Sequence, residues 1–493
     1  MSFINRLFDA SNSSENLADF IQISSIEIYD FFISQKNSSI LSYRNEITNY
    51  ILLPETYRVY SNLDFSDSKN QTFLYCLLDL SQRFGLSTEF QQLYNLATRN
   101  DVSINSRFQA TNRFLVGIKT INDYEGKIND ILNDLSVSYL EEEDNEQKTI
   151  ATLINFYTEV FYNFGQQNTE RVIEFKNKLL EELQKEEYSF LYTQSIDEVL
   201  SYSLDDINEL YQAVHTKLDE VLERASQYLA FNIEPNLIES ETHYAELLAS
   251  ISADFIEIRD LSAKLYSTVK NDSIFYSLNR GVNVLVEQNQ LLAYLYSFGK
   301  MHYEKIISAI NPIERHDLED KFEVYDWGCG QGLASICFLQ RLNEQDIDYF
   351  VSKFTLIEPS EIAIKRGSLH LRKFKSDIQI VTINKDLDSL ENSDFGRIDN
   401  GTKIHLFSNI LDIELFLMND LINLIKHNFK GKNIFICVSP NESKYKRDRI
   451  DDFVQSFTNS SNFEIISNIS EKNGEWTGTS WSRIIRVFKC IIK

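Results

Sequence analysis

Three alternating glycines, preceded by an acid, form the most specific chemical motif of the chain. Residues 324–335 read Val-Tyr-Asp-Trp-Gly-Cys-Gly-Gln-Gly-Leu-Ala-Ser, so a β-rich run ends at Asp326 and small or apolar residues follow Gly332. A β-carbon in such a turn would keep a ligand away from the main chain and from the start of the next helix. The pattern therefore predicts that Gly328, Gly330 and Gly332 hold a nucleotide-type cofactor against the backbone.

The spacing of these glycines separates two classes of cofactor. The dinucleotide fingerprint G-x-G-x-x-G, counted from Gly328, requires glycine or alanine where Leu333 stands. Counted from Gly330, it requires glycine where Ser335 stands. An NAD-dependent dehydrogenase is therefore disfavoured. The order acid-x-G-x-G-x-G instead resembles motif I of the class I S-adenosylmethionine (SAM) dependent methyltransferases.

The resemblance covers residues 286–493. It implies a Rossmann-like α/β domain of seven strands that binds SAM at the glycine loop and at Asp326, and it implies methyltransferase activity. It does not imply the methyl acceptor, because acceptor sites in this fold are built from added segments. The alternative is a catalytically silent sensor or scaffold that binds SAM or a related nucleotide.

Two further acids follow strand-like runs. The run Lys353–Glu358 ends in an acid 26 residues beyond Gly332. A carboxylate at that place can accept hydrogen bonds from both ribose hydroxyls, which is the role that the resemblance gives Glu358. After the third run, the resemblance assigns Asp386 to the adenine amino group. Asp388 competes for that role, and an ordinary turn acid is an equally good interpretation.

The fourth β-rich run ends at Asn409. In the family this strand end faces the methyl group, so the resemblance places Asn409 at the cofactor or the substrate. The sequence lacks here the Asn-Pro-Pro-aromatic signature that many nucleic-acid amino-methylases carry. We therefore expect a small-molecule or protein acceptor rather than a nucleic acid.

Methyl transfer requires in-line alignment of the acceptor with an activated methyl group, and a base only where the acceptor is protonated. The sequence assigns no catalytic residue and no metal site. Candidates for the substrate pocket are Tyr296 and His302 on the preceding helix, and Trp476 and Trp481 between the last two β-rich runs. His302 could serve as a base near neutral pH, and a structural hydrogen-bond donor is an equally good interpretation of this histidine. Core packing is the competing interpretation for the aromatic residues.

The elements that position these residues follow a β-α alternation. Short β-rich runs alternate with helical segments after residue 320, which predicts an α/β sheet that is parallel at first and antiparallel in its last pair. A long helix is expected from Val282 to Ile310, ended by Asn311-Pro312. The seven runs read FEVYDW, KFTLIEP, DIQIVTI, KIHLFSN, KNIFICVS, FEIISNI and SRIIRVFKCII.

The first part of the chain has a different character. Residues 1–280 contain four glycines and two prolines, which favours long helices. Apolar residues between Ile196 and Ala225 recur mostly every three or four positions, as on one face of a helix. We expect a large all-helical domain over 1–285, which selects the substrate or contacts a protein partner, followed by the SAM-binding domain over 286–493.

The charge, the cysteines and the hydropathy of the chain restrict the environment in which the protein can work. Of a net charge of −25, the whole excess lies in residues 1–320, and such an acidic surface repels phosphate backbones. The five cysteines form no C-x-x-C pair and are expected to be buried thiols in a reducing compartment. No signal-like N-terminus or membrane-length apolar run is seen, so we expect a cytoplasmic protein without a membrane partner.

Overall fold

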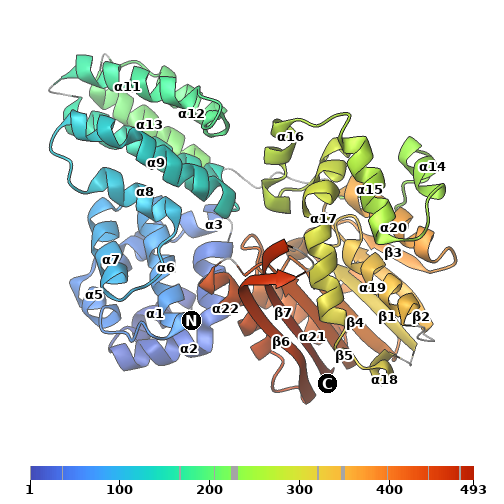
Figure 1. Ribbon diagram of the computed structural model, residues 1–493. Helices are drawn as coiled ribbons and strands as arrows, with labels where there is room; N and C mark the ends of the chain where they lie inside the picture. Colours follow the sequence, from blue (N-terminus) through green and yellow to red (C-terminus); the bar gives the residue numbers. More distant parts are fainter. Residues whose placement is uncertain are drawn as a thin grey trace. The chain divides into compact units, whose positions relative to one another are not determined.

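The computed structural model describes residues 2–35, 37–165, 168–204, 206–223, 231–318, 321–345, 350–396, 398–441, 443–476 and 479–493. Side chains of residues 473–481 lie outside this description. The chain divides into two compact units, Met1–Tyr228 and Leu229–Lys493 (Figure 1).

The described residues of the N-terminal unit form helices and no strand, which confirms the helical class expected from the sequence. Helix α9, Ile121–Glu141, illustrates why these residues form helices. Thr120 and Asp123 form a capping box at its start, and Tyr124, Ile128 and Leu135 are buried on one face. The other helices are α1 Phe3–Ala10, α2 Ser14–Tyr29, η1 Asp30–Ser34, α3 Asn37–Leu41, α4 Arg44–Leu52, α5 Pro54–Tyr60, α6 Ser68–Arg83, α7 Ser87–Arg99, α8 Ser106–Leu115, η2 Glu146–Ile150, α10 Ala151–Phe164, α11 Thr169–Leu183, η3 Ser189–Leu191, α12 Gln194–Ser201 and α13 Ile207–Glu223.

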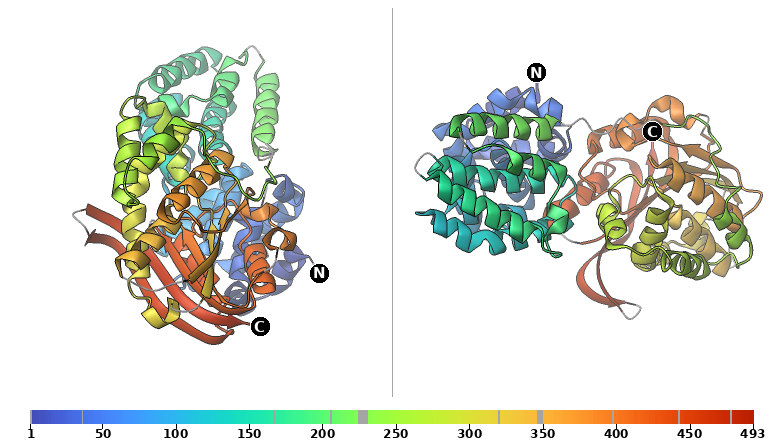
Figure 2. Two further views of the ribbon diagram at one scale, coloured as in Figure 1. Left: turned by 90° about the vertical axis from the view of Figure 1, so that its right-hand side faces the viewer. Right: turned by 90° about the horizontal axis from the view of Figure 1, so that it is seen from above.

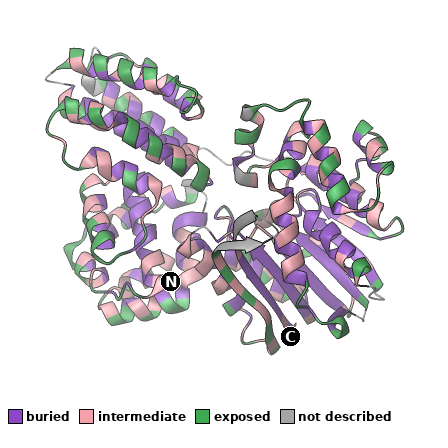
Figure 3. Cartoon of the chain, viewed as in Figure 1, coloured by how far each residue is buried: buried purple, intermediate pink, exposed green. Residues whose placement is uncertain are grey.

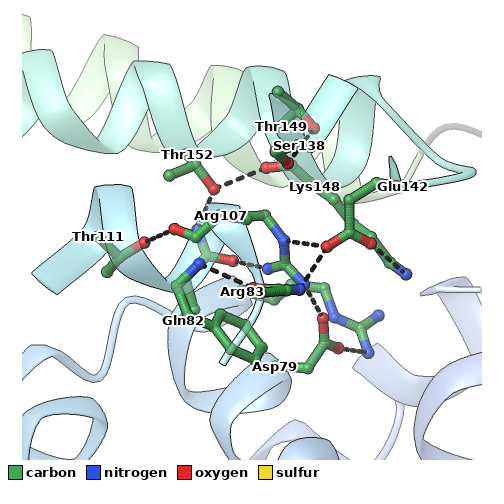
Figure 4. A network of polar contacts seen from close by, with 12 residues as sticks. Asp79, Gln82, Arg83, Arg107, Thr111, Ser138, Glu142, Lys148, Thr149 and Thr152 are labelled. Atoms are coloured by element: carbon green, nitrogen blue, oxygen red, sulfur yellow. Dashed lines mark hydrogen bonds and ion pairs between the residues drawn. The ribbon is translucent and has the colours of Figure 1, made fainter. Parts of the chain in front are cut away.

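A buried network of charged side chains joins helices of this unit (Figure 4). Arg107 on α8 donates to Asp79 on α6 and to Glu142 after α9, at 2.5 and 3.0 Å, and Lys148 lies 3.2 Å from Glu142. Burial opposes ionisation of Asp79, but Arg83 and Arg107 outweigh it and hold the pKa of Asp79 at about 2. Ion pairs thus tie α6, α8 and the segment after α9 inside the core of this unit.

The C-terminal unit contains a seven-stranded sheet in the order β3-β2-β1-β4-β5-β7-β6. Strands β1 to β5 pair in parallel, and β7 runs antiparallel to both β5 and β6. The expected fold class is therefore confirmed, and each of the seven predicted runs is a strand. Their bounds are β1 Lys321–Trp327, β2 Phe350–Ile357, β3 Ile380–Ile383, β4 Thr402–Ser408, β5 Gly431–Ser439, β6 Ser461–Trp476 and β7 Thr479–Ile492.

Helices cover both faces of this sheet, whose central strands are buried (Figure 3). Alternate residues of β1 lie on opposite faces of the sheet. Phe322 packs against Phe338 of α19, whereas Tyr325 packs against Phe429, which follows α21. Figure 2 shows the sheet from two further sides, with the β6–β7 hairpin extending past the rest of the unit. The helices are α14 His243–Ala249, α15 Phe255–Tyr266, α16 Asp272–Ser277, η4 Asn279–Gly281, α17 Gln288–Ile310, α18 Arg315–Leu318, α19 Leu333–Glu344, α20 Glu361–Phe374, η5 Leu387–Ser389, η6 Asn392–Phe395, α21 Met418–Asn428 and α22 Lys444–Gln455.

The division between the units differs from the boundary expected at residues 285 and 286. The segment from residue 231 already belongs to the C-terminal unit, because it lies along the outer side of β3. The N–H of Thr382 donates to the Pro235 carbonyl at 2.7 Å, and Arg366 of α20 forms a buried ion pair with Glu239. Composition could not reveal this, since the segment is as poor in glycine and proline as the helical unit.

Two expected helices also begin or break elsewhere. The helix expected from Val282 starts as α17 at Gln288, where Glu287 and Gln290 form a capping box. The single apolar stripe expected from Ile196 to Ala225 is divided between α12 and α13, because the chain is extended at Tyr202. The described apolar residues of this stripe are buried, so the helical spacing was predicted correctly. The single continuous helix was predicted wrongly.

The five cysteines are free thiols, and each is buried. Within the described ranges, no helix combines the length and the apolar character needed to cross a membrane.

Candidate functional site

The glycine loop joins the end of β1 to the start of α19. Gly328, Gly330 and Gly332 have φ values of 61°, 50° and 74°, in the left-handed region that other residues rarely adopt. A β-carbon on Gly328 would lie 2.5 Å from Ile410, and one on Gly332 would lie 3.1 Å from the Gly367 backbone. A β-carbon on Gly330 would meet no protein atom within 4 Å. Two glycines thus permit close packing, and the middle one faces open space.

Asp326 lies beneath this loop and is 1% exposed. Its Oδ2 accepts hydrogen bonds from the N–H and hydroxyl of Ser335, at 3.3 and 2.6 Å, which ties β1 to α19. Its Oδ1 is buried and has no partner among the described residues. Burial raises the pKa of Asp326 to about 7 in spite of these bonds. The side chain therefore holds the loop from below.

Glu358 lies at the end of β2, beside the loop. Its Oε2 accepts a 2.9 Å hydrogen bond from the N–H of Gly330, and its Oε1 accepts one of 3.0 Å from Ser360. Burial raises the pKa of Glu358 to about 7, although both hydrogen bonds favour the ionised form. The acid and the middle glycine that the sequence singled out are thus in direct contact.

The end of β3 carries the third predicted acid. Asp386 begins the short helix η5 and accepts a 2.7 Å hydrogen bond from the N–H of Ser389, and Asp388 accepts from the N–H of Leu417 at 2.8 Å. Asp386 thus caps η5, Asp388 joins this turn to the residue before α21, and the adenine role of Asp386 stays a prediction. Asn384, which the sequence did not single out, donates to the carbonyls of Glu358 and Pro359.

Asn409 follows β4 with φ of 56° and meets two residues of α17. Lys305 donates to its Oδ1 at 2.7 Å, and its Nδ2 lies 2.6 Å from Nδ1 of His302. The hydroxyl of Tyr294 lies 3.1 Å from Nε2 of the same imidazole. The structure thus brings Asn409 and His302 together and adds Tyr294 and Lys305. The contacts of Asn409 with Lys305 and His302 join residues 104 and 107 positions apart in the sequence, which no local pattern reveals.

The surroundings of His302 disfavour the role of a base near neutral pH. Burial, together with the charge of Lys305, lowers the pKa of His302 to about 3, so the imidazole is neutral at physiological pH and a weak proton acceptor. Tyr296 is exposed and packs against Tyr266, with ring centroids 5.4 Å apart, rather than against His302. Trp476 and Trp481 lie in β6 and β7, and their side chains fall outside the described residues.

The arrangement fits SAM on three counts. Open space beside Gly330 leaves the backbone accessible, Glu358 offers a carboxylate at the neighbouring strand end, and the buried Oδ1 of Asp326 gives the floor of the site a negative character once ionised. Helix α19 follows the loop directly, and the Ser335 N–H in its first turn donates to Asp326. These groups can hold a nucleoside, and the cluster at Asn409 lies at the end of the next strand of the sheet.

Comparisons with known proteins found partial similarities. No family model matches the chain. A curated relative, carboxy-S-adenosyl-L-methionine synthase of Vibrio atlanticus (strain LGP32), is 27% identical over 92 residues, which are 19% of this chain and 36% of that protein. The matched region thus spans about a third of the relative's length.

Two solved methyltransferases share low similarity with part of the chain. Precorrin-6y C5,15-methyltransferase from Geobacter metallireducens GS-15 covers 38% of this chain and 86% of its own, with 12% identity and a TM-score of 0.25. Geranyl diphosphate C-methyltransferase from Streptomyces coelicolor A3(2), in complex with S-adenosyl-L-homocysteine, covers 52% and 100%, with 11% identity and a TM-score of 0.24.

The assignment of the fold rests on the strand order, with β7 inserted antiparallel between β5 and β6, and on the glycine loop after β1. The C-terminal unit has the Rossmann-like fold of the class I SAM-dependent methyltransferases.

Proposed function

We propose that the C-terminal unit binds SAM along the glycine loop and transfers its methyl group to a small-molecule or protein acceptor. The observation that supports this most is the hydrogen bond between Gly330 and Glu358, beside a glycine whose missing side chain leaves open space. A main-chain surface and an adjacent carboxylate are what a nucleoside with two ribose hydroxyls requires. Gly328, Gly332 and Asp326 shape the loop, Asp386 receives the adenine, and Asn409 lies at the reacting end.

SAM, when bound, supplies a methyl group on a positively charged sulfur, which is already activated for transfer. The chain then has to align the acceptor and exclude water. The neutral groups at the end of β4 are suited to alignment, because His302 and Asn409 provide fixed dipoles without a competing nucleophile. We therefore propose catalysis by alignment, without a general base from His302.

A second candidate is chemical change of the cofactor itself. The observation in its favour is the similarity to carboxy-SAM synthase over 92 residues. Mass spectrometry of cofactor recovered after incubation with cell extract separates the possibilities: methyl transfer yields S-adenosylhomocysteine, whereas the second candidate yields carboxylated SAM. Recovery of unchanged SAM from a tight complex would favour a sensor or scaffold.

Titration calorimetry of the full chain with SAM and with NAD tests the cofactor. We expect binding of SAM alone, and binding of NAD without SAM would overturn the proposal. Incubation with methyl-labelled SAM and separate small-molecule, protein and RNA fractions then identifies the acceptor class. Label in the small-molecule or protein fraction is the expected result, and label only in RNA would contradict the proposed acceptor.

We also propose that the N-terminal helical unit selects the acceptor or binds a protein partner. Its helices hold no residue of the cofactor site just described, while their buried ion pairs provide a rigid body. Deletion of residues 1–228 tests this: the expected result is loss of transfer to the acceptor with SAM binding retained. Undiminished transfer by the remaining unit would refute the assigned role.

A further inference from the structure

A second histidine, His370, contacts the backbone of the glycine loop. Its Nδ1 lies 2.9 Å from the carbonyl oxygen of Gln331, the residue between Gly330 and Gly332. His370 belongs to α20 and is 0% exposed. The sequence did not single out this residue, yet it touches the part of the chain that is proposed to hold SAM.

Helix α20 also packs against the loop through a glycine one turn before His370. A β-carbon on Gly367 would lie 3.1 Å from the carbonyl carbon of Gln331 and 3.1 Å from the nitrogen of Gly332. The helix can come this close because Gly367 has no side chain. Residues three apart lie on the same side of a helix, so Gly367 and His370 both face the peptide that joins Gln331 to Gly332.

The carbonyl group decides the direction of the hydrogen bonds of His370. A backbone carbonyl can only accept, so Nδ1 carries a proton and donates to Gln331. Burial, together with the charge of Arg366, lowers the pKa of His370 to about 3, so the ring is neutral at physiological pH. A neutral imidazole with its proton on Nδ1 has a bare Nε2, which accepts from the Tyr244 hydroxyl 2.8 Å away.

Tyr244 is in turn held by a buried ion pair. It lies on α14, and the guanidinium carbon of Arg366 lies 3.5 Å from the centroid of its ring. Arg366 is 2% exposed and donates to Glu239 and to Gln288 at the start of α17. Glu239 and Tyr244 both belong to the segment that lies before α17 in the sequence. This segment therefore reaches the glycine loop through His370.

We propose that His370 is a positioning residue for the cofactor, whose Nδ1–H group fixes the Gln331 carbonyl and so keeps the space beside Gly330 open for SAM. Tyr244 and Arg366 hold the imidazole in place. Without the Nδ1 donor the buried carbonyl has to turn toward another partner, and SAM binds only the fraction of molecules whose loop keeps its present form. The inference rests on the proposed function for its ligand, whereas the contacts of His370 do not depend on it.

Nitrogen NMR of histidine-labelled full-length protein tests the contact without a ligand. The His370 signals, assigned by their loss in the variant His370→Asn, are expected to show a neutral ring with the proton on Nδ1 at pH 7. A bare Nδ1 would overturn the inference, because this atom could not then donate to Gln331. A charged ring would also overturn it, because Tyr244 could not then donate to Nε2.

Calorimetric titration of two His370 variants with SAM tests the positioning role. His370→Asn keeps an N–H donor close to the place of Nδ1, whereas His370→Leu has a similar size and no donor. We expect the leucine variant to bind SAM about five- to hundredfold more weakly, the range for one buried group left without its hydrogen bond. The asparagine variant should restore most of this loss and bind within about threefold of wild type.

His405→Leu is the matched control, because His405 is also 0% exposed and makes two buried hydrogen bonds, with Trp327 and Asn433. This control should melt at a lower temperature than wild type but bind SAM with wild-type affinity. Wild-type affinity in His370→Leu, equal loss in both His370 variants, or equal loss in the two leucine variants would overturn the inference. Absence of SAM binding by the wild type would overturn the proposed function and with it the role of His370, whereas the NMR result still decides the direction of the hydrogen bonds.

Discussion

The main-chain N–H of Gly330 donates a 2.9 Å hydrogen bond to the carboxylate of Glu358. This contact joins the loop after β1 to the end of β2, two adjacent parallel strands. Each of the two residues contributes a property that a ligand site needs. The glycine leaves space for a ligand, and the carboxylate can accept hydrogen bonds from that ligand. The proposed cofactor site depends on this pair.

Gly330→Ala is expected to abolish or strongly weaken SAM binding while the protein stays folded. The new methyl group meets no protein atom within 4 Å, so any steric conflict is with the ligand. The matched control is Gly396→Ala, because Gly396 also has a positive φ, of 55°, and open space around it. Calorimetry should show wild-type affinity in the control. Equal loss of affinity in both variants would attribute the effect to backbone strain instead.

SAM affinity should rise with pH between 6 and 8. The pKa of Glu358 is raised to about 7, so the acid is mostly protonated at pH 6 and mostly ionised at pH 8, when it can accept two further hydrogen bonds. The ionised fraction of Glu358 rises roughly tenfold from pH 6 to pH 8, so we expect SAM affinity to rise by up to the same factor. Glu358→Gln is the control, because titration of SAM itself affects both proteins equally. Parallel pH profiles of wild type and control would contradict the prediction.

Asp326→Asn should stabilise the C-terminal unit at high pH. The folded pKa of Asp326, about 7, lies above the ordinary value of 3.8 for this acid, so its contribution to stability is complete below pH 4 and is lost as the pH rises to 7. The loss amounts to at most about 4 kcal/mol for a shift of this size. All three tryptophans lie at 327, 476 and 481, so fluorescence follows this unit alone. The melting temperature of the variant, relative to wild type, should increase from pH 5 to pH 8, and a constant difference would show that Asp326 is not titrating.

Arg107→Ala should destabilise the helical unit by about 3–5 kcal/mol, because it leaves Asp79 and Glu142 buried without their partner. Arg113→Ala on the same helix removes a partly exposed ion pair with Asp134 and should cost less than about 1 kcal/mol. Circular dichroism reports both units, whereas tryptophan fluorescence reports only the C-terminal one. Equal melting of the two variants by circular dichroism would rule out a stabilising role for the buried network.

Local patterns were sufficient to predict the sheet and the loop. Seven β-rich runs became seven strands, because buried parallel strands are continuous apolar segments that stand out from the helices between them. The glycines at 328, 330 and 332 form the loop that their spacing indicated, and the structure adds that all three have positive φ. Glu358 could be found for the same reason, since it directly follows an apolar strand.

Contacts between distant residues could not be predicted in this way. Asn409 and His302 were both singled out, but nothing in the sequence showed that they touch, or that Lys305 and Tyr294 complete the group. The buried ion pairs of Arg107 were missed because charged residues on a helix are normally solvated. Residues 231–285 resemble the helical unit in composition, and only their hydrogen bonds to β3 and α20 assign them to the other unit.

The most direct measurement is calorimetric titration of full-length wild type and Glu358→Ala with SAM. The account predicts one SAM per chain in the wild type and binding weaker by about 1–3 kcal/mol in the variant, the worth of hydrogen bonds to a charged group. Equal affinity in the two proteins, or no binding of SAM by the wild type, would contradict it.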